Sequence, residues 1–203
     1  MQGLILKDLM NIKQQWKTYL FIIGLWGIIG IFTQETGFFG GVMMVFIVLV
    51  PVYAMGYDEK VKWDRYALTM PVSRKELVFS RYALALLCGA VTFVLSAAVT
   101  FFLTKDVAES LLTCLLTTSI GLIIAAIDLP LLFRFGVEKG RIILLAGFAM
   151  PGLLGVILVN TVLDGGIRID DPERLLFLLP LAAVIAFPVS ALISVKLYEK
   201  KEF

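Results

Sequence analysis

The sequence contains no histidine and only two cysteines, Cys88 and Cys114. Without imidazole side chains, catalysis by a Ser-His-Asp triad, histidine-ligated zinc and histidine-ligated haem are excluded. Both cysteines lie inside long apolar runs, so we expect neither a disulfide framework nor a cysteine-based metal site. The chain itself is therefore expected to hold no metal and no cofactor.

Charged residues are also scarce, at 17% of the 203 residues, against roughly 25% in soluble proteins. Apolar residues make up 60% of the chain. A soluble domain of this size cannot hide so much apolar surface, because its surface is too large for its volume. The composition argues against a soluble enzyme, a nucleic-acid-binding domain and a disordered chain, and it predicts a membrane protein.

Long apolar stretches are what the sequence has in abundance. A helix that crosses a bilayer needs about 20 mainly apolar residues, and six stretches meet this requirement. We predict an all-α polytopic membrane protein, in which residues 1–203 form a single transmembrane domain. The expected spans are residues 18–34, 38–57, 74–104, 108–133, 141–163 and 174–197.

The basic residues are distributed unevenly between the two sides of these spans. With the N-terminus placed inside, fifteen of the 18 Lys and Arg residues fall on the cytoplasmic side, and only Lys105, Arg168 and Arg174 fall outside. Cytoplasmic loops carry an excess of Lys and Arg. Both termini are therefore predicted to be cytoplasmic. Since the outer connections are short, substrate is expected to enter from the membrane or the cytoplasm.

An amphipathic segment, residues 3–17, precedes the first span. Its apolar residues recur at helical spacing and its remaining positions are mostly polar. This pattern is typical of a helix that lies in the membrane interface; the alternative is a polar lead-in to the first span. The apolar stripe consists of Ile5, Leu9, Ile12 and Trp16.

The most informative segment lies between the second and third spans and reads DEKVKWDRYALTMPVSRKELVFSRY. Pro71 must end a helix that precedes it, because its ring blocks continuation. Ser73, followed by Glu76 three residues later, is the signature of a capping box that starts the next helix. We predict a short cytoplasmic helix over residues 58–70, a turn, and a helix that enters the third span.

The predicted helix over residues 58–70 is amphipathic. Its apolar stripe consists of Trp63, Tyr66, Ala67 and Met70. The charged residues that cover its other faces are Asp58, Glu59, Lys60, Lys62, Asp64 and Arg65. Such an element suits docking into a groove on a soluble partner, and it equally suits a helix that lies on the membrane surface against anionic lipid.

Together with two other segments, this element resembles the ABC-2 type permeases, the membrane subunits of ABC exporters. The three matching segments are GLILKDLMNIK at the start, YDEKVKWDRYALTMPVSRKELVFSRY in the middle, and DLPLLFRFGVEKGR at the end of the fourth span. The order of elements agrees along the whole chain. The closest likeness is to small bacterial permeases whose ATPases are separate chains, among them exporters of phenol-soluble modulins.

The resemblance implies a function for residues 58–70, since in that family this helix is the coupling helix that contacts the ATPase. The sequence has no G-x-x-x-x-G-K-[ST] motif, so it cannot cradle ATP phosphates itself. ATP and Mg²⁺ are therefore expected in a partner ATPase. The resemblance further implies a second permease subunit, identical or related, and a place in the bacterial cytoplasmic membrane, with cargo such as amphipathic or antimicrobial-type peptides or hydrophobic compounds.

Three residues within the spans are candidates for a transport pathway or a gate. Asp128 is the ionisable residue that lies well inside a span, where a charge costs about 2.5–3.5 kcal/mol at mid-membrane. Pro130 follows it and can kink the helix. Trp26 could line a path for amphipathic cargo. The alternatives are an interfacial carboxylate paired with a cation, an ordinary membrane proline, and a ring that packs or faces lipid.

Other function classes fit the sequence less well. A secondary transporter or channel would use Asp128 as an ion or proton site, but such proteins typically carry several intramembrane charges or paired discontinuous helices. An intramembrane enzyme would need a second carboxylate or an activating base. A scaffold or immunity protein would act even without ATP hydrolysis in a partner.

Overall fold

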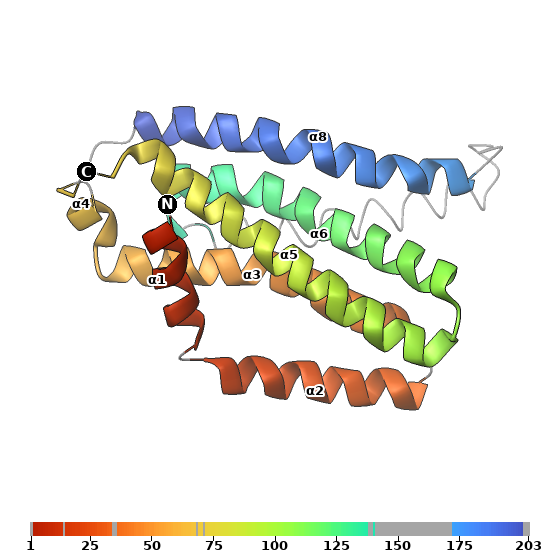
Figure 1. Ribbon diagram of the computed structural model, residues 1–203. Helices are drawn as coiled ribbons and strands as arrows, with labels where there is room; N and C mark the ends of the chain where they lie inside the picture. Colours follow the sequence, from red (N-terminus) through yellow and green to blue (C-terminus); the bar gives the residue numbers. More distant parts are fainter. Residues whose placement is uncertain are drawn as a thin grey trace.

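The computed structural model describes residues 2–13, 15–33, 36–67, 69–70, 72–137, 140 and 172–200. Within these residues the ordered elements are all helices, as the sequence predicts (Figure 1). They are α1 (Gln2–Lys13), α2 (Trp16–Thr33), α3 (Thr36–Lys60), α4 (Trp63–Ala67), α5 (Arg74–Thr104), α6 (Val107–Phe135) and α8 (Pro172–Glu199). The span expected over residues 141–163 lies outside the described residues.

Among the described residues, five helices are long and apolar enough to cross a membrane: α2, α3, α5, α6 and α8. Helix α6 is central, because it packs against α3, α5 and α8. Helix α2 lies apart from this bundle beside α3 (Figure 1). Most side chains of α2 are exposed, as suits a helix that faces lipid or another subunit.

Helices α3 and α6 approach closely where glycine replaces a side chain. A Cβ atom at Gly121 would lie 2.9 Å from Cδ1 of Ile47 and 3.1 Å from Cγ of Met44. Small residues allow such close approach between membrane helices. The absence of a side chain at Gly121 therefore sets how near α3 comes to α6.

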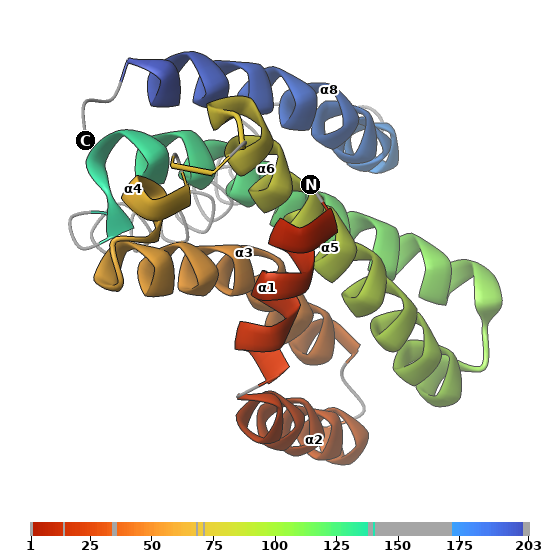
Figure 2. The same ribbon diagram turned by 60° about the vertical axis from the view of Figure 1, so that its left-hand side comes forward.

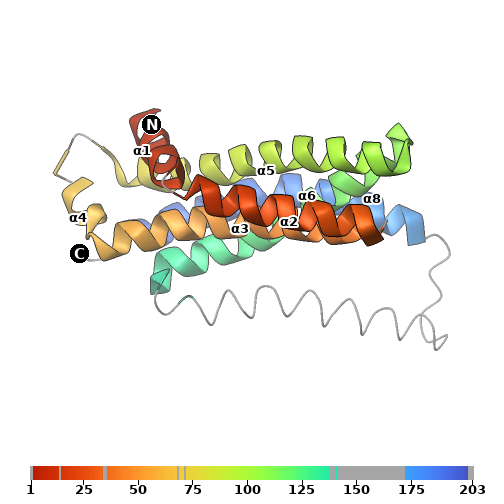
Figure 3. The ribbon, with the colours of Figure 1, turned by 90° about the horizontal axis from the view of Figure 1, so that it is seen from below.

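The start of α1, the helix α4 and the end of α8 lie at the same end of the bundle (Figures 1 and 3). Hydrogen bonds join this end together: the Arg74 guanidinium at the start of α5 donates to the carbonyl oxygen of Glu199 at 2.6 Å. Helix α1, helix α4 and the end of α8 therefore meet at one end of the bundle.

Helix α1 differs from the predicted helix over residues 3–17. It ends at Lys13, and Trp16 already begins α2. Helix α1 lies across α3 and α5 rather than along them (Figures 1 and 2). Its inward face carries Leu4 and the fully buried Asp8. The large exposed apolar residues of α1 are Leu6, Leu9 and Met10.

The orientation of α1 therefore reverses the usual arrangement of an amphipathic helix on a soluble protein. Lys7 and Asp8 contact the bundle beside the buried Leu4, whereas Leu6, Leu9 and Met10 point away from it. Of the predicted stripe, Leu9 and Trp16 are exposed and Ile5 and Ile12 are half-buried, with Trp16 on the next helix. An outward apolar face suits contact with lipid at the membrane interface.

Candidate functional site

The segment between α3 and α5 is the candidate site, and its helix is shorter than the predicted 58–70. Helix α3 continues through Lys60, so Asp58 and Glu59 belong to its last turn. Lys62 then takes the left-handed conformation, with φ of 53°, which ends α3 and redirects the chain. Helix α4 begins at Trp63 and ends at Ala67. Met70 therefore lies beyond α4, in the turn that follows.

The apolar stripe expected on this segment is divided between two faces. Ala67 is fully buried and Trp63 is partly buried against the core. Tyr66 is 58% exposed, and Met70 is also exposed. The side chains of Asp64 and Arg65 lie outside what the structure describes. Helix α4 is thus attached to the bundle by one face and presents Tyr66 outward.

Exposed side chains of two kinds precede and follow α4 along the chain. Val61 and Met70 add apolar surface on either side of α4. Lys60 and Lys62 are exposed cations at the end of α3 and in the turn. The surface formed by Lys60, Val61, Lys62, Tyr66 and Met70 is called the α4 surface below. Its mixture of apolar and cationic groups fits an acidic, apolar-lined partner groove.

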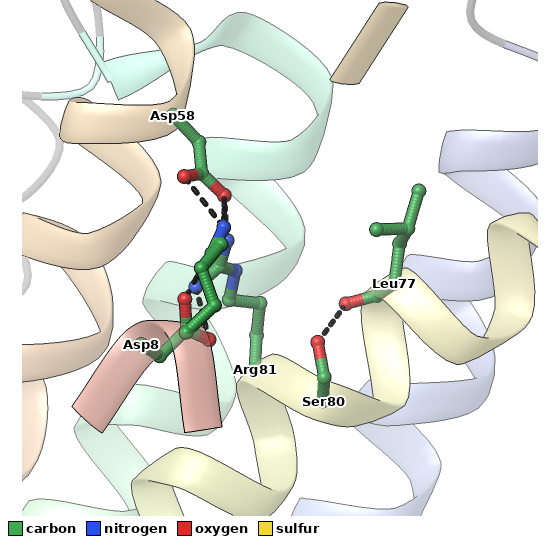
Figure 4. Close-up of polar contacts among 6 residues, drawn as sticks. Asp8, Asp58, Leu77, Ser80 and Arg81 are labelled. Carbon is green, nitrogen blue, oxygen red and sulfur yellow. Dashed lines mark hydrogen bonds and ion pairs between the residues drawn. The ribbon is translucent and has the colours of Figure 1, made fainter. Parts of the chain in front are cut away.

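Beneath the α4 surface, four charged side chains form a closed ring of alternating sign. Lys7 Nζ lies 2.6 Å from Asp58 Oδ2 and 3.3 Å from Asp8 Oδ1. The Arg81 guanidinium forms an ion pair with Asp8 at 2.6 Å and a hydrogen bond with Asp58. Figure 4 shows Arg81 reaching from α5 between Asp8 and Asp58. We call this group the ion ring.

The ion ring joins α1, the end of α3 and the start of α5. Asp8 is 0% exposed, Asp58 3% and Arg81 6%. Two cations balance two carboxylates, so the buried group carries no net charge. Removal of one partner from a buried ion pair costs about 3–5 kcal/mol, since the other charge stays buried without compensation. Each member of the ring therefore depends on its neighbours.

The position of Asp58 corrects one expectation from the sequence. Asp58 was expected on the partner-contacting helix, but its carboxylate points into the bundle and contacts Lys7 and Arg81. Neighbouring Glu59 is exposed, and its Oε2 accepts a hydrogen bond from the backbone N–H of Val137 at 2.6 Å. Asp58 is therefore held inside the bundle, whereas Glu59 stays exposed at the end of α3.

The start of α5 is fixed by a capping box between Ser73 and Glu76. Ser73 Oγ accepts from the backbone N–H of Glu76 at 3.2 Å, and Glu76 Oε2 accepts from the backbone N–H of Ser73 at 2.9 Å. The two residues satisfy donors that a helix N-terminus leaves free. Together with the bond from Arg74 to the Glu199 carbonyl, this cap ties the exit of the α4 segment to α8.

A hydroxyl chain compensates for Pro130 within α6. Proline has no N–H, so the carbonyl oxygen of Ala126 four residues earlier loses its helical donor. Ser190 Oγ on α8 donates to this carbonyl. The Tyr82 hydroxyl on α5 lies 2.7 Å from the hydroxyls of both Ser190 and Ser194. Side chains of α5 and α8 thus meet the carbonyl group of α6 that Pro130 leaves without a donor.

Asp128 and Trp26 lie at different places in the structure. Asp128 is 0% exposed on α6, and neither carboxylate oxygen has a hydrogen-bond partner within the part of the chain that the structure describes. Trp26 lies half-buried on α2, which stands apart from the bundle. The described residues therefore do not bring these two side chains into one site.

Several members of this site were not predicted from the sequence. Lys7, Asp8 and Arg81 were counted as charges near the membrane surface, and Ser190 was not singled out. Two signals in the sequence could have indicated them. Arg81 lies near the start of a span, where a cation is expected to have an ionic partner. Pro130 lacks an N–H, so the carbonyl oxygen of Ala126 needs a hydrogen-bond donor from elsewhere.

A family model described as ABC-2 family transporter protein matches residues 3–199, nearly the whole chain. The chain belongs to the ABC-2 transporter family. This confirms the resemblance drawn from the three sequence segments. It is therefore a multi-pass membrane component of a transporter. Permeases of this family work with an ATPase subunit. Comparisons with curated proteins and with solved structures give no significant match.

Proposed function

We propose that this ABC-2 permease is the membrane-spanning subunit of an ATP-driven exporter and that its α4 surface docks on a separate ATPase chain. The observation that carries the proposal is the division of α4 into a buried face and an exposed face. Ala67 is inaccessible while Tyr66 is 58% exposed. A helix anchored in this way can receive a force at Tyr66 and transmit it to the bundle through Ala67.

The charge pattern supports the same assignment. Lys60 and Lys62, at the end of α3 and in the turn before α4, are exposed, so an acidic groove would attract this end of the molecule. Since this chain lacks a phosphate-binding loop, ATP and Mg²⁺ bind in the partner ATPase, and the motion that follows hydrolysis reaches the permease at α4. The corresponding transport cycle is alternating access.

Cargo and assembly follow from the apolar character of the chain. Helix α2 carries exposed apolar side chains, which suits contact with a second permease subunit, identical or related, in the bacterial cytoplasmic membrane. The described outer connection between α5 and α6 consists of Lys105 and Asp106 alone. Cargo therefore enters from the membrane or the cytoplasm, as amphipathic peptides and hydrophobic compounds do.

Co-purification with the ATPase encoded beside this chain tests the proposal. The variant Tyr66→Ala with Met70→Ala removes the exposed apolar groups and leaves the buried Ala67 and the ion ring intact. Stoichiometric ATPase is expected with the wild-type chain and at least a tenfold lower yield, about 1.4 kcal/mol, with the variant. Phe102→Ala, at the opposite end of α5, is the matched control and should retain the ATPase.

A second candidate function rests on Asp128. Its buried carboxylate, without a hydrogen-bond partner among the described residues, is the feature expected of an ion or proton site in a transporter that needs no ATPase. That function predicts ion-driven transport by the purified chain alone, abolished by Asp128→Asn. The exporter predicts instead that transport requires the ATPase and ATP.

A further inference from the structure

Helix α1 and helix α4 are connected by a direct chain of charged contacts. Lys7 of α1 lies with its Nζ 4.6 Å from the centroid of the Trp63 ring, a cation–π distance. Trp63 is the first residue of α4. The same ammonium belongs to the ion ring, because it contacts Asp58 and Asp8. One side chain of α1 therefore touches both the ring and the start of α4.

The ion ring also fixes both segments that lead into and out of α4. Asp58 lies on the last turn of α3, five residues before α4 begins, and Arg81 lies on α5, after α4 and the turn. A direct contact joins these two residues, and α1 adds Asp8 and Lys7 as a second connection between them. Without α1, the contact between Asp58 and Arg81 would be the remaining part of the ion ring between these two stems, which also pack directly as α3 and α5.

The outer face of α1, opposite the ion ring, is apolar and suits contact with the membrane interface. Leu6 and Met10 are exposed on the side opposite the buried Asp8, and exposed Lys13 follows at the end of the helix. Apolar side chains next to a cation suit the boundary between acyl chains and anionic headgroups. Helix α1 is thus held between the membrane interface on one face and the ion ring on the other.

We propose that α1 is a positioning element for ATP-driven transport: through Lys7 and Asp8 it sets the orientation of α4 relative to the bundle. This inference rests on the proposed function of α4. It adds a role for Lys7 and Asp8, which the docking of α4 on an ATPase does not itself involve. Lys7, Asp8 and Arg81 act through α4 and do not contact the ATPase or cargo. Loosening of the ring should leave ATPase docking intact and weaken the transfer of motion.

The test uses a charge-balanced variant that releases α1. Lys7→Gln with Asp8→Asn removes one cation and one anion, so the remaining Asp58–Arg81 pair stays neutral. The matched control, Lys75→Gln with Glu199→Gln, removes the exposed pair between α5 and α8, which is 3.9 Å apart. Both variants lose the same charges, and they differ in whether the ion ring is opened.

Distances are measured in the full-length permease alone, in lipid nanodiscs. Spin labels are attached at Thr69→Cys and Lys196→Cys after both native cysteines are replaced by alanine. The distance distribution between the labels is expected to broaden in the Lys7→Gln/Asp8→Asn variant and to stay narrow in the control. If the two variants give the same narrow distribution, α1 does not position α4 and the inference is overturned.

A second readout uses the complete complex in proteoliposomes. The amount of bound ATPase should be unchanged in the Lys7→Gln/Asp8→Asn variant, while cargo moved per ATP hydrolysed falls by about threefold or more. Unchanged transport per ATP contradicts the inference. If the wild-type chain recruits no ATPase, the proposed function fails, and the label distances still decide whether α1 positions α4.

A milder pair of variants covers the case in which the double variant does not fold. Lys7→Arg keeps the cation in the ring and over Trp63, whereas Lys7→Gln removes it. Lys7 is the most exposed member of the ring, so its replacement disturbs folding least. Narrow label distances in Lys7→Arg and broad ones in Lys7→Gln support the inference; equal widths in the two variants overturn it.

Discussion

The hydroxyl of Ser190 donates a hydrogen bond to the carbonyl oxygen of Ala126, two helices meeting at one backbone group. This carbonyl is the acceptor that Pro130 leaves without its helical donor. In the membrane interior, an unsatisfied carbonyl has no water to turn to. The same bond therefore satisfies the freed carbonyl of α6 and joins α6 to α8.

Ser190→Ala should destabilise the permease because it leaves the Ala126 carbonyl without a donor. Hydrogen bonds between membrane helices contribute about 0.6 kcal/mol on average and at most about 1.7 kcal/mol, and a loss within this range is expected in detergent unfolding. Pro130→Ala supplies the missing backbone N–H. In that background Ser190→Ala should cost less, and equal costs in the two backgrounds would contradict this account of the Ala126 carbonyl.

Ala67→Leu should displace α4 although it adds only apolar atoms. Ala67 is fully buried in the core, so a larger side chain forces the neighbours apart, at a typical cost of about 1–3 kcal/mol. The α4 surface itself is unchanged by this substitution. We expect a lower melting temperature and weaker ATPase recovery. Full recovery of the ATPase with normal transport would show that the burial of Ala67 has no role in coupling.

Gly121→Ala should weaken the contact between α3 and α6. The added Cβ would lie 2.9 Å from Ile47 Cδ1, so one helix must shift or Ile47 must move. Gly24→Ala is the matched control, because no atom lies within 4 Å of the corresponding Cβ. Both changes raise helix propensity by up to about 1 kcal/mol, and their difference in unfolding free energy isolates the clash.

The clash at Gly121 can be relieved from the other side. Ile47→Val removes the Cδ1 atom that the new Cβ would meet, so the Gly121→Ala/Ile47→Val double variant should recover part of the lost stability. Additive effects of the two substitutions would show that residues 47 and 121 are not in contact.

Arg81→Gln should be more destabilising than the loss of both Arg81 and one of its carboxylates. The single variant leaves Asp8 and Asp58 buried with one cation, at a cost of about 3–5 kcal/mol for a broken buried pair. Asp58→Asn with Arg81→Gln restores neutrality, since Lys7 and Asp8 remain as a pair. Thermal unfolding should rank wild type first, the double variant second and Arg81→Gln last; the reverse order of the variants would contradict the ring.

The helices and the capped start of α5 were predictable because their signals are local. Apolar runs give the positions of the described spans, and Ser73 with Glu76 caps the start of α5. The ion ring was not predictable in the same way, because residues 7, 58 and 81 meet only when three helices pack. Periodicity placed Asp58 on an exposed helix, whereas Lys7 and Arg81 draw its carboxylate into the bundle.

The orientation of α1 shows a related limit of sequence patterns. The apolar stripe through Leu9 indicated an amphipathic helix but not which face would meet the protein. A membrane protein can place the apolar face toward lipid and the charged face inward, provided that the charges find partners. Arg81 and Asp58 are those partners, and they lie more than fifty residues further along the chain.

The central claim, that the α4 surface contacts a separate ATPase, is tested most directly by cross-linking in intact membranes. A photo-reactive amino acid is placed at position 66 on α4 and, for comparison, at position 102 near the far end of α5, both exposed. The account predicts a cross-link from position 66 to the ATPase encoded beside this chain and none from position 102. Absence of the ATPase adduct from position 66, in membranes that contain both proteins, would contradict it.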